Sequence, residues 1–131
     1  MSDASTTLYT RLGGHAGILR LITPFYARVR RDPLLGPIFN ERIQDWDSHL
    51  AKITEFWAGM TDGPGMYPGG MGRHFFLPID AAHFDAWLAA WEANARMMLA
   101  PAEADEISAL ARRIGDDLQA MLARRRALEG R

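Results

Sequence analysis

Apolar residues recur at helical spacing in four long stretches of the chain. Residues 15–31 place apolar side chains three or four positions apart, and the stretches that begin near residues 46, 80 and 101 repeat this spacing. Such a pattern gathers the apolar side chains on one face of an α-helix. Neither an alternating strand pattern nor a hairpin sequence is present. The pattern therefore predicts an all-α fold in a single domain, 1–131, with loose or frayed ends at 1–7 and 124–131.

Glycine and proline divide the first half of the chain. Leu8–Leu12 predicts one helical turn, which Gly13-Gly14 then ends. Pro24 lies inside the helix expected over 15–31, and an interior proline costs about 3 kcal/mol. We therefore expect a kink there, or a helix that effectively restarts. Residues 34–39 predict a short apolar connector.

Acidic residues and a proline mark where the later helices begin. Asp45 or Asp47 is expected to cap the second long helix, and Asp80 the third. Pro101 suits the first position of the fourth helix. Between the second and third helices, residues 59–72 contain five glycines after Met60 and two prolines. A loop of this length in a small domain usually carries a function.

Composition limits the chemistry that the chain can support. At 131 residues with a net charge of −1, the chain has no overall field that would attract nucleic acid or anionic lipid. Cysteine is absent, which excludes disulfides, iron–sulfur clusters and thiolate-ligated metals. The chain has no apolar run of about 20 residues that could span a membrane, and its first 15 residues are polar. We therefore expect a cytoplasmic protein.

Four histidines remain as candidate metal ligands. His15 follows the glycine pair and suits a surface or capping role, whereas His83 lies in the first turn of a helix and favours a structural role. His74 closes the glycine-rich loop and enters an apolar tract. A histidine in this position is well placed to bind a metal or a flat cofactor such as haem, which needs one axial base and apolar walls. The alternative is an ordinary buried histidine.

Three other side chains bring hydrogen-bond donors to apolar helical faces. Tyr26, His49 and Trp87 each need a partner if they are buried. Three such groups around a dry pocket would suit a small ligand that gains negative charge on binding, as dioxygen does at ferrous iron. The alternative is that each finds water or a backbone carbonyl.

An ordered set of sequence blocks resembles the truncated haemoglobins. The blocks are Phe25-Tyr26, Leu35–Phe39, His49–Trp57, Gly72–Ile79 and His83–Leu88, within residues 8–122. The histidine before Leu50 and the Phe56-Trp57 pair are most similar to group III. The glycine pairs at 13–14 and 69–70 are similar to those of the other groups.

The resemblance implies a globin-like two-over-two helical sandwich around one haem b, with His74 as the proximal iron ligand. Tyr26, Trp87 and His49 match distal residues that contact the bound gas, and Ile53 is expected to face that gas. Arg73 or Lys52 is a candidate partner for a haem propionate. The remaining cofactor contacts expected from residue type are Phe39, Phe56, Phe76 and Met98.

The implied function is binding of O2, CO and NO at ferrous iron. Three distal donors would hold dioxygen tightly, which argues against bulk delivery. The alternative is a haem enzyme that dioxygenates NO or reduces peroxide with electrons from an unidentified reductase. The sequence leaves the oligomeric state open, as well as whether His49 itself ligates the iron at rest. Pro24 raises the further question of whether the Tyr26 hydroxyl reaches the gas.

Overall fold

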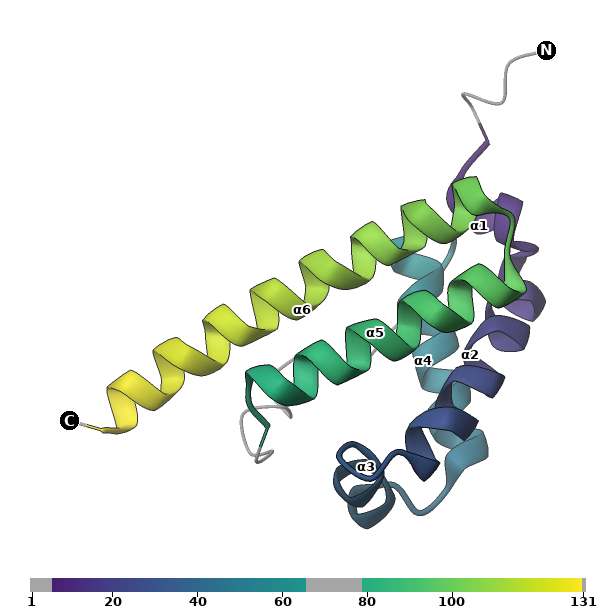
Figure 1. The fold of residues 1–131 in the computed structure, drawn as a ribbon. Helices are drawn as coiled ribbons and strands as arrows, with labels where there is room; N and C mark the ends of the chain where they lie inside the picture. Colours follow the sequence, from purple (N-terminus) through teal and green to yellow (C-terminus); the bar gives the residue numbers. More distant parts are fainter. Residues whose placement is uncertain (1–5, 66–78, 131) are drawn as a thin grey trace.

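The computed structural model describes residues 6–65 and 79–130, whose regular structure is helical throughout (Figure 1). This confirms the all-α prediction. The helices are α1 (Leu8–Leu12), α2 (Gly14–Arg31), α3 (Gly36–Arg42), α4 (Trp46–Met60), α5 (Ala81–Met98) and α6 (Pro101–Glu129). Within this part of the chain, no helix is long and apolar enough to cross a membrane.

Two pairs of long helices build the fold. α5 and α6 lie side by side and run in opposite directions, and α2 packs against both α4 and α5 (Figure 1). α6 is the longest helix and extends past the beginning of α5. The two pairs form the two-over-two arrangement that the sequence resemblance implied.

The N-terminal turn follows the glycine pattern. Thr7 caps α1 by accepting a hydrogen bond from the backbone N–H of Thr10. Gly13 and Gly14 then adopt φ angles of +100° and +70°, which residues with a side chain rarely adopt. The two glycines let the chain turn sharply from α1 into α2, as the sequence predicted.

The first half of the chain departs from the sequence prediction at one segment. Of the two alternatives expected at Pro24, a restarted helix is not seen, because one helix runs from Gly14 to Arg31. The segment predicted as a connector is partly helical, since α3 begins at Gly36. The carboxylate of Asp32 accepts hydrogen bonds from the backbone N–H groups of Leu34 and Leu35, at 2.8 and 2.9 Å, which orders the turn that leads into α3.

The starts of the later helices agree with the sequence. Asp45, one of two candidate caps, accepts a hydrogen bond from Ser48 N at 3.1 Å. Asp80 caps α5, and Pro101 is the first residue of α6. Beyond residue 124, where a loose or frayed end was expected, α6 continues to Glu129, and an ion pair joins Arg125 to Glu129.

The core lies where the two helix pairs cross. Its largest buried side chains come from α2, α4, α5 and α6, and they are Phe25, Ile18, Ile22, Trp57, Trp91 and Ile107. One buried polar side chain joins two of these helices: Asn94 on α5 donates a 2.8 Å hydrogen bond to the backbone oxygen of Leu21 on α2. Burial of these large apolar groups fixes the walls of the site described next.

Candidate functional site

A cavity of ≈ 560 Å³ opens beside this core. The volume is typical of pockets that hold a small molecule or a cofactor. Every helix except α1 contributes to its lining, which consists of Tyr26, Leu35, Ile38, Phe39, Arg42, Ile43, Gln44, Asp45, Ser48, His49, Lys52, Ile53, Phe56, Trp57, Ile79, His83, Phe84, Trp87, Ile114, Gly115 and Leu118. Most of these side chains are apolar, and the exposed ones include Arg42 and Lys52.

The three side chains predicted to contact a bound gas all line this cavity. Tyr26 comes from α2, His49 from α4 and Trp87 from α5. The rings of Tyr26 and His49 meet edge to face, with centroids 5.6 Å apart. Phe25 contacts both Tyr26 and Trp87, at 4.8 and 6.0 Å between centroids. The structure therefore gathers residues from three helices at one place.

Trp46 packs against the side chains of Tyr26 and His49. Its ring centroid lies 5.9 Å from that of Tyr26 and 5.4 Å from that of His49. The guanidinium of Arg30 lies 4.5 Å from the centre of the Trp46 ring, in a cation–π contact. Trp46 was not among the side chains that the sequence predicted for this cluster. The signal was its position three residues before His49, which places both side chains on the same face of α4.

The predicted cofactor contacts divide into two groups. Phe39, Lys52, Ile53 and Phe56 line the cavity. Met98 does not: it is 45 % exposed at the C-terminal end of α5 and is absent from the lining. Eleven residues of helix separate it from Trp87, which corresponds to about 16 Å along the axis. Met98, which was predicted as a cofactor contact, therefore lies away from the described cavity lining.

Three predicted residues, Arg73, His74 and Phe76, lie outside the described residues. The chain re-enters the described part at Ile79, which lines the cavity. The side chain of Arg126, on α6, donates a hydrogen bond to the backbone oxygen of Ile79. This contact joins the backbone of Ile79 to α6.

His83 lines the cavity but also belongs to the cap of α5. Its Nδ1 lies 3.1 Å from the backbone nitrogen of Asp80 and 3.0 Å from the Asp80 carboxylate. When protonated at Nδ1, the ring donates to the carboxylate; otherwise it accepts from the backbone N–H. The hydrogen bond from the His83 side chain, assisted by the backbone N–H groups of His83 and Ala82, lowers the pKa of Asp80. This capping contact agrees with the structural role predicted for His83.

His15 has polar partners on two other helices. Its Nδ1 contacts the Tyr9 hydroxyl on α1, and its Nε2 lies 2.7 Å from the Glu55 carboxylate on α4. His15 is not part of the cavity lining. The predicted surface role agrees with this position.

The sequence did not predict the contribution of α6 to the cavity, and from α3 it predicted Phe39 alone. Ile38 and Ile43 lie within and directly after α3, whereas Ile114 and Leu118 lie on α6. The spacing of Ile114 and Leu118 marked an apolar helical face, but spacing cannot say which neighbour that face meets. Helix packing alone assigns that face to the cavity.

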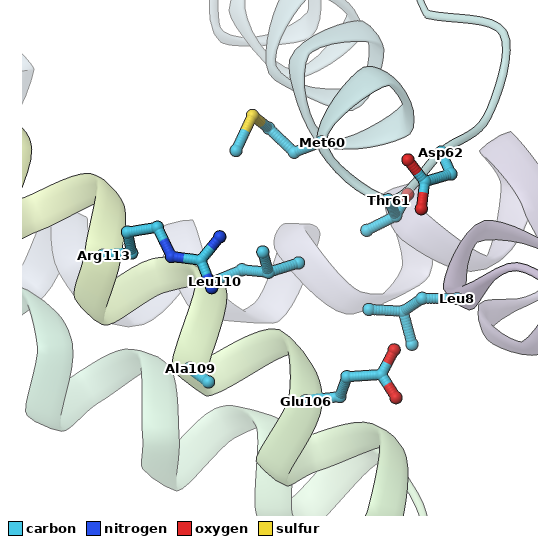
Figure 2. Close-up of a pocket in the computed structure, with 8 residues that line it drawn as sticks. All are labelled: Leu8, Met60, Thr61, Asp62, Glu106, Ala109, Leu110 and Arg113. Atoms are coloured by element: carbon cyan, nitrogen blue, oxygen red, sulfur yellow. The ribbon is translucent and has the colours of Figure 1, made fainter.

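A second, smaller hollow of ≈ 220 Å³ shares no lining residue with the first. Figure 2 shows its lining, drawn from α1, the end of α4 and α6: Leu8, Met60, Thr61, Asp62, Glu106, Ala109, Leu110 and Arg113. Glu106 already forms an ion pair with Arg11, in which the guanidinium Nη2 of Arg11 lies 2.9 Å from a carboxylate oxygen of Glu106. Among residues 6–65 and 79–130, none of the predicted site residues lines this hollow.

The larger cavity suits haem in its size, its apolar walls and its charges. The aromatic and aliphatic lining fits a flat apolar ring, and exposed Arg42 and Lys52 are positioned to meet carboxylates at its edge. With the two-over-two helices, these features define a haem protein of the globin type. The chain belongs to the bacterial-like globin family, whose model matches residues 7–119.

Individual relatives agree with this family. The group 3 truncated hemoglobin ctb of Campylobacter jejuni is 37 % identical over 111 residues, covering 80 % of this chain and 87 % of the relative. The group 1 truncated hemoglobin GlbN of Nostoc commune is 31 % identical over 83 residues, or 62 % of this chain and 69 % of that protein.

Solved structures are similar across most of the chain. The group III truncated hemoglobin from Campylobacter jejuni has a TM-score of 0.78 at 36 % identity, covering 83 % of this chain and 91 % of its own. The group II 2-on-2 hemoglobin from Agrobacterium tumefaciens has a TM-score of 0.73 at 28 % identity, covering 91 % and 98 %. Family membership makes haem b the cofactor and diatomic gases the ligand class of this chain.

Proposed function

We propose that the chain binds O2, CO and NO in the cavity between α2, α4 and α5, on a haem held by His74. Bound haem supplies the ferrous iron at which such gases bind. His74 is the candidate axial ligand because it lies between the glycine-rich loop and Ile79, which itself lines the cavity. The observation that carries the proposal is the meeting of Tyr26, His49 and Trp87 at one largely apolar cavity.

Each of these three groups has a role in holding the gas. The hydroxyl of Tyr26 donates a hydrogen bond to the gas, assisted by the indole N–H of Trp87 and by His49. Tyr26 is only 6 % exposed, so its hydrogen bond forms in a place where few water molecules compete. A hydrogen bond to a charged group contributes about 1.5–3 kcal/mol. Two or three together slow the release of dioxygen by orders of magnitude, which supports retention over bulk delivery.

The charged side chains at the cavity orient the haem. Arg42 and Lys52 are exposed and line the cavity, so either can pair with a propionate without burying a charge. Ile53 and Phe56, on the same helix as Lys52, supply apolar contact to the ring. His74 would hold the iron, and the donors from α2 and α4 would contact the bound gas.

Optical spectra of the ferric, ferrous and carbonyl forms test this proposal. We expect a Soret band within about 400–430 nm, the usual haem range. His74→Ala should abolish stable haem retention. His83→Ala serves as the matched control and should retain the haem, because His83 caps α5. Retention by His74→Ala together with loss by His83→Ala would contradict the proximal assignment.

A second candidate function is turnover instead of storage, either NO dioxygenation or peroxide reduction with electrons from a reductase. The observation that favours it is a set of stacked indoles beside the cavity, in which Trp57 and Trp91 have ring centroids 4.5 Å apart. Both storage and turnover need a reductase that keeps the iron ferrous. We therefore propose that the protein is located in the cytoplasm. The oxygen release rate, compared with the rate of ferric haem reduction by cell extract, separates storage from turnover.

A further inference from the structure

Three of the four tryptophans stack on one another beside the cavity. The rings of Trp57 and Trp91 are nearly parallel, at 15°, with centroids 4.5 Å apart. Those of Trp91 and Trp87 are 20° from parallel, with centroids 5.8 Å apart. Trp91 is therefore the shared member of what we call the indole stack, Trp57–Trp91–Trp87.

The indole stack touches the cavity at both ends. Trp57 and Trp87 belong to the cavity lining, whereas Trp91 lies behind them and is 1 % exposed. Phe25 turns an edge toward the rings of Trp87 and Trp91. An electron can therefore leave Trp91 for the cavity through rings in contact, without crossing water or backbone.

Packing explains why a large apolar ring occupies position 91. It does not explain why that ring carries a polar nitrogen. The Nε1 atom of Trp91 is buried and has no hydrogen-bond acceptor among residues 6–65 and 79–130. A buried donor without an acceptor destabilises the fold, and a phenylalanine at this position would avoid that cost. Indole differs from phenyl in being far easier to oxidise by one electron.

We propose that the indole stack is a one-electron donor to oxidants in the cavity, and that Trp91 carries the resulting radical. The proposal rests on the proposed haem site. Parallel indole faces stabilise a positive charge on the ring between them, as in a cation–π contact. Because Trp91 N–H faces no acceptor in the described part of the chain, the radical keeps its proton and remains a cation. A returning electron then restores the indole with no proton transfer.

With hydrogen peroxide as the oxidant, the reaction balances as a two-electron reduction. The O–O bond breaks, and two electrons and two protons from solvent convert the two oxygens to two water molecules. The indole stack supplies one electron, and a one-electron reductant such as ascorbate supplies the other. A second equivalent of that reductant returns one electron to the indole stack, so the protein regains its starting state.

Electron paramagnetic resonance of the haem-loaded chain, frozen soon after mixing with hydrogen peroxide, tests the proposal. We expect a radical whose hyperfine pattern changes when the tryptophan is deuterated on its indole ring. The signal should be lost in Trp91→Phe and kept in Trp46→Phe, the same substitution outside the stack. Transfer into heavy water should remove the coupling to the proton on Nε1. A radical assigned to tyrosine, or one unchanged by Trp91→Phe, would overturn the proposal.

A second oxidant tests, without haem, whether the indole stack gives up an electron. Flash oxidation with a soluble ruthenium tris-bipyridine complex and persulfate removes one electron from the most easily oxidised site of the same protein. We again expect the isotope-sensitive tryptophan radical, and its loss in Trp91→Phe. If Trp91→Phe does not fold, the radical is assigned to the indole stack from Trp57→Phe and from the isotope label in the unsubstituted chain.

The two experiments separate this inference from the proposed function. A chain that shows no Soret band contradicts the haem site, while the ruthenium experiment still tests the stack. A chain that binds haem but forms no tryptophan radical under either oxidant contradicts the stack as an electron donor and leaves gas binding intact.

Discussion

The two walls of the large cavity differ in chemistry. The wall built by α2 and α4 carries polar groups, namely Tyr26, Ser48, His49 and Lys52. Phe84, Ile114 and Leu118 make the α5–α6 wall largely apolar, with His83 and the indole of Trp87 as its polar members. Both walls use amphipathic helices of ordinary composition. The difference lies in which residue types face inward.

This difference indicates that the two walls have different roles. An apolar wall excludes water and holds a flat ring by contact area, whereas polar groups on the other wall distinguish one small ligand from another. Substitutions of apolar residues in the α5–α6 wall should therefore change stability and cofactor retention. Substitutions in the α2–α4 wall should change ligand kinetics. The predictions below test that separation.

The largest effect on stability is expected from the apolar wall. Leu118→Ala removes a side chain that is 6 % exposed, and leucine-to-alanine changes in a core cost about 2–5 kcal/mol. We expect the lower part of this range, because the residue borders a cavity. Urea unfolding of the haem-loaded protein measures the free energy of unfolding, and transfer of haem to an acceptor protein measures retention.

Leu128→Ala is the matched control for this substitution. Leu128 lies on the same helix and is 65 % exposed, so its loss should change stability by no more than about 0.5 kcal/mol. The dioxygen release rate of Leu118→Ala should stay close to that of the unsubstituted protein. A large change in release rate would mean that the apolar wall also selects the ligand.

On the polar wall, Tyr26→Phe should accelerate dioxygen release with little loss of stability. Removing a hydrogen bond to a charged ligand costs about 1.5–3 kcal/mol, which corresponds to about a 10- to 140-fold faster release. Stopped-flow displacement of dioxygen by CO measures this rate. Tyr9→Phe, whose hydroxyl contacts His15 away from the cavity, should leave the rate unchanged. An unchanged rate in Tyr26→Phe would mean that Pro24 directs the hydroxyl away from the gas.

The smallest effect concerns the cap of α5, which sets the start of the apolar wall. The folded protein lowers the pKa of Asp80 below its usual 3.8, so the charged carboxylate stabilises the fold above that pH. This stabilisation is lost as the pH falls through the lowered pKa. Asp80→Ala should lower the thermal midpoint at pH 7, and the difference from the unsubstituted protein should disappear in strong acid.

Asp80→Asn separates the capping hydrogen bond from the charge. Asparagine caps helices about as well as aspartate, so this variant should retain most of the stability at pH 7. Because the amide does not titrate, its contribution should not fall in acid. If Asp80→Asn and Asp80→Ala behaved alike at pH 7, the carboxylate charge and not the capping geometry would be the source of the stability.

Much of the secondary structure followed from local rules. Helix starts at Asp45, Asp80 and Pro101 depend on backbone N–H groups within a few residues, so neighbouring sequence is enough to place them. The sharp turn at Gly13-Gly14 is local in the same way. α3 was missed because the turn before it depends on a side-chain cap from Asp32, in a stretch that otherwise shows only apolar residues.

Only part of the candidate site could be predicted from the sequence. Tyr26, His49 and Trp87 were identified because polar atoms on apolar helical faces are unusual, and the resemblance to truncated haemoglobins added their roles. Met98 shared a helical face with Trp87, but a position along the helix axis matters only once the helices are packed. The roles of His74, Arg73 and Phe76 remain predictions, because those residues lie outside the described chain.

By itself, the sequence determined where the long helices lie and which face of each is apolar, because these depend on side-chain chemistry and on neighbours a few positions away. Tertiary structure alone decided that Ile114 and Leu118 complete the cavity, and that Trp57, Trp91 and Trp87 stack into one unit. Apart from the contact of Trp87 with Trp91, which are one helical turn apart on α5, these contacts join residues more than twenty positions apart. Their geometry is set by how four amphipathic helices pack, which no local pattern encodes.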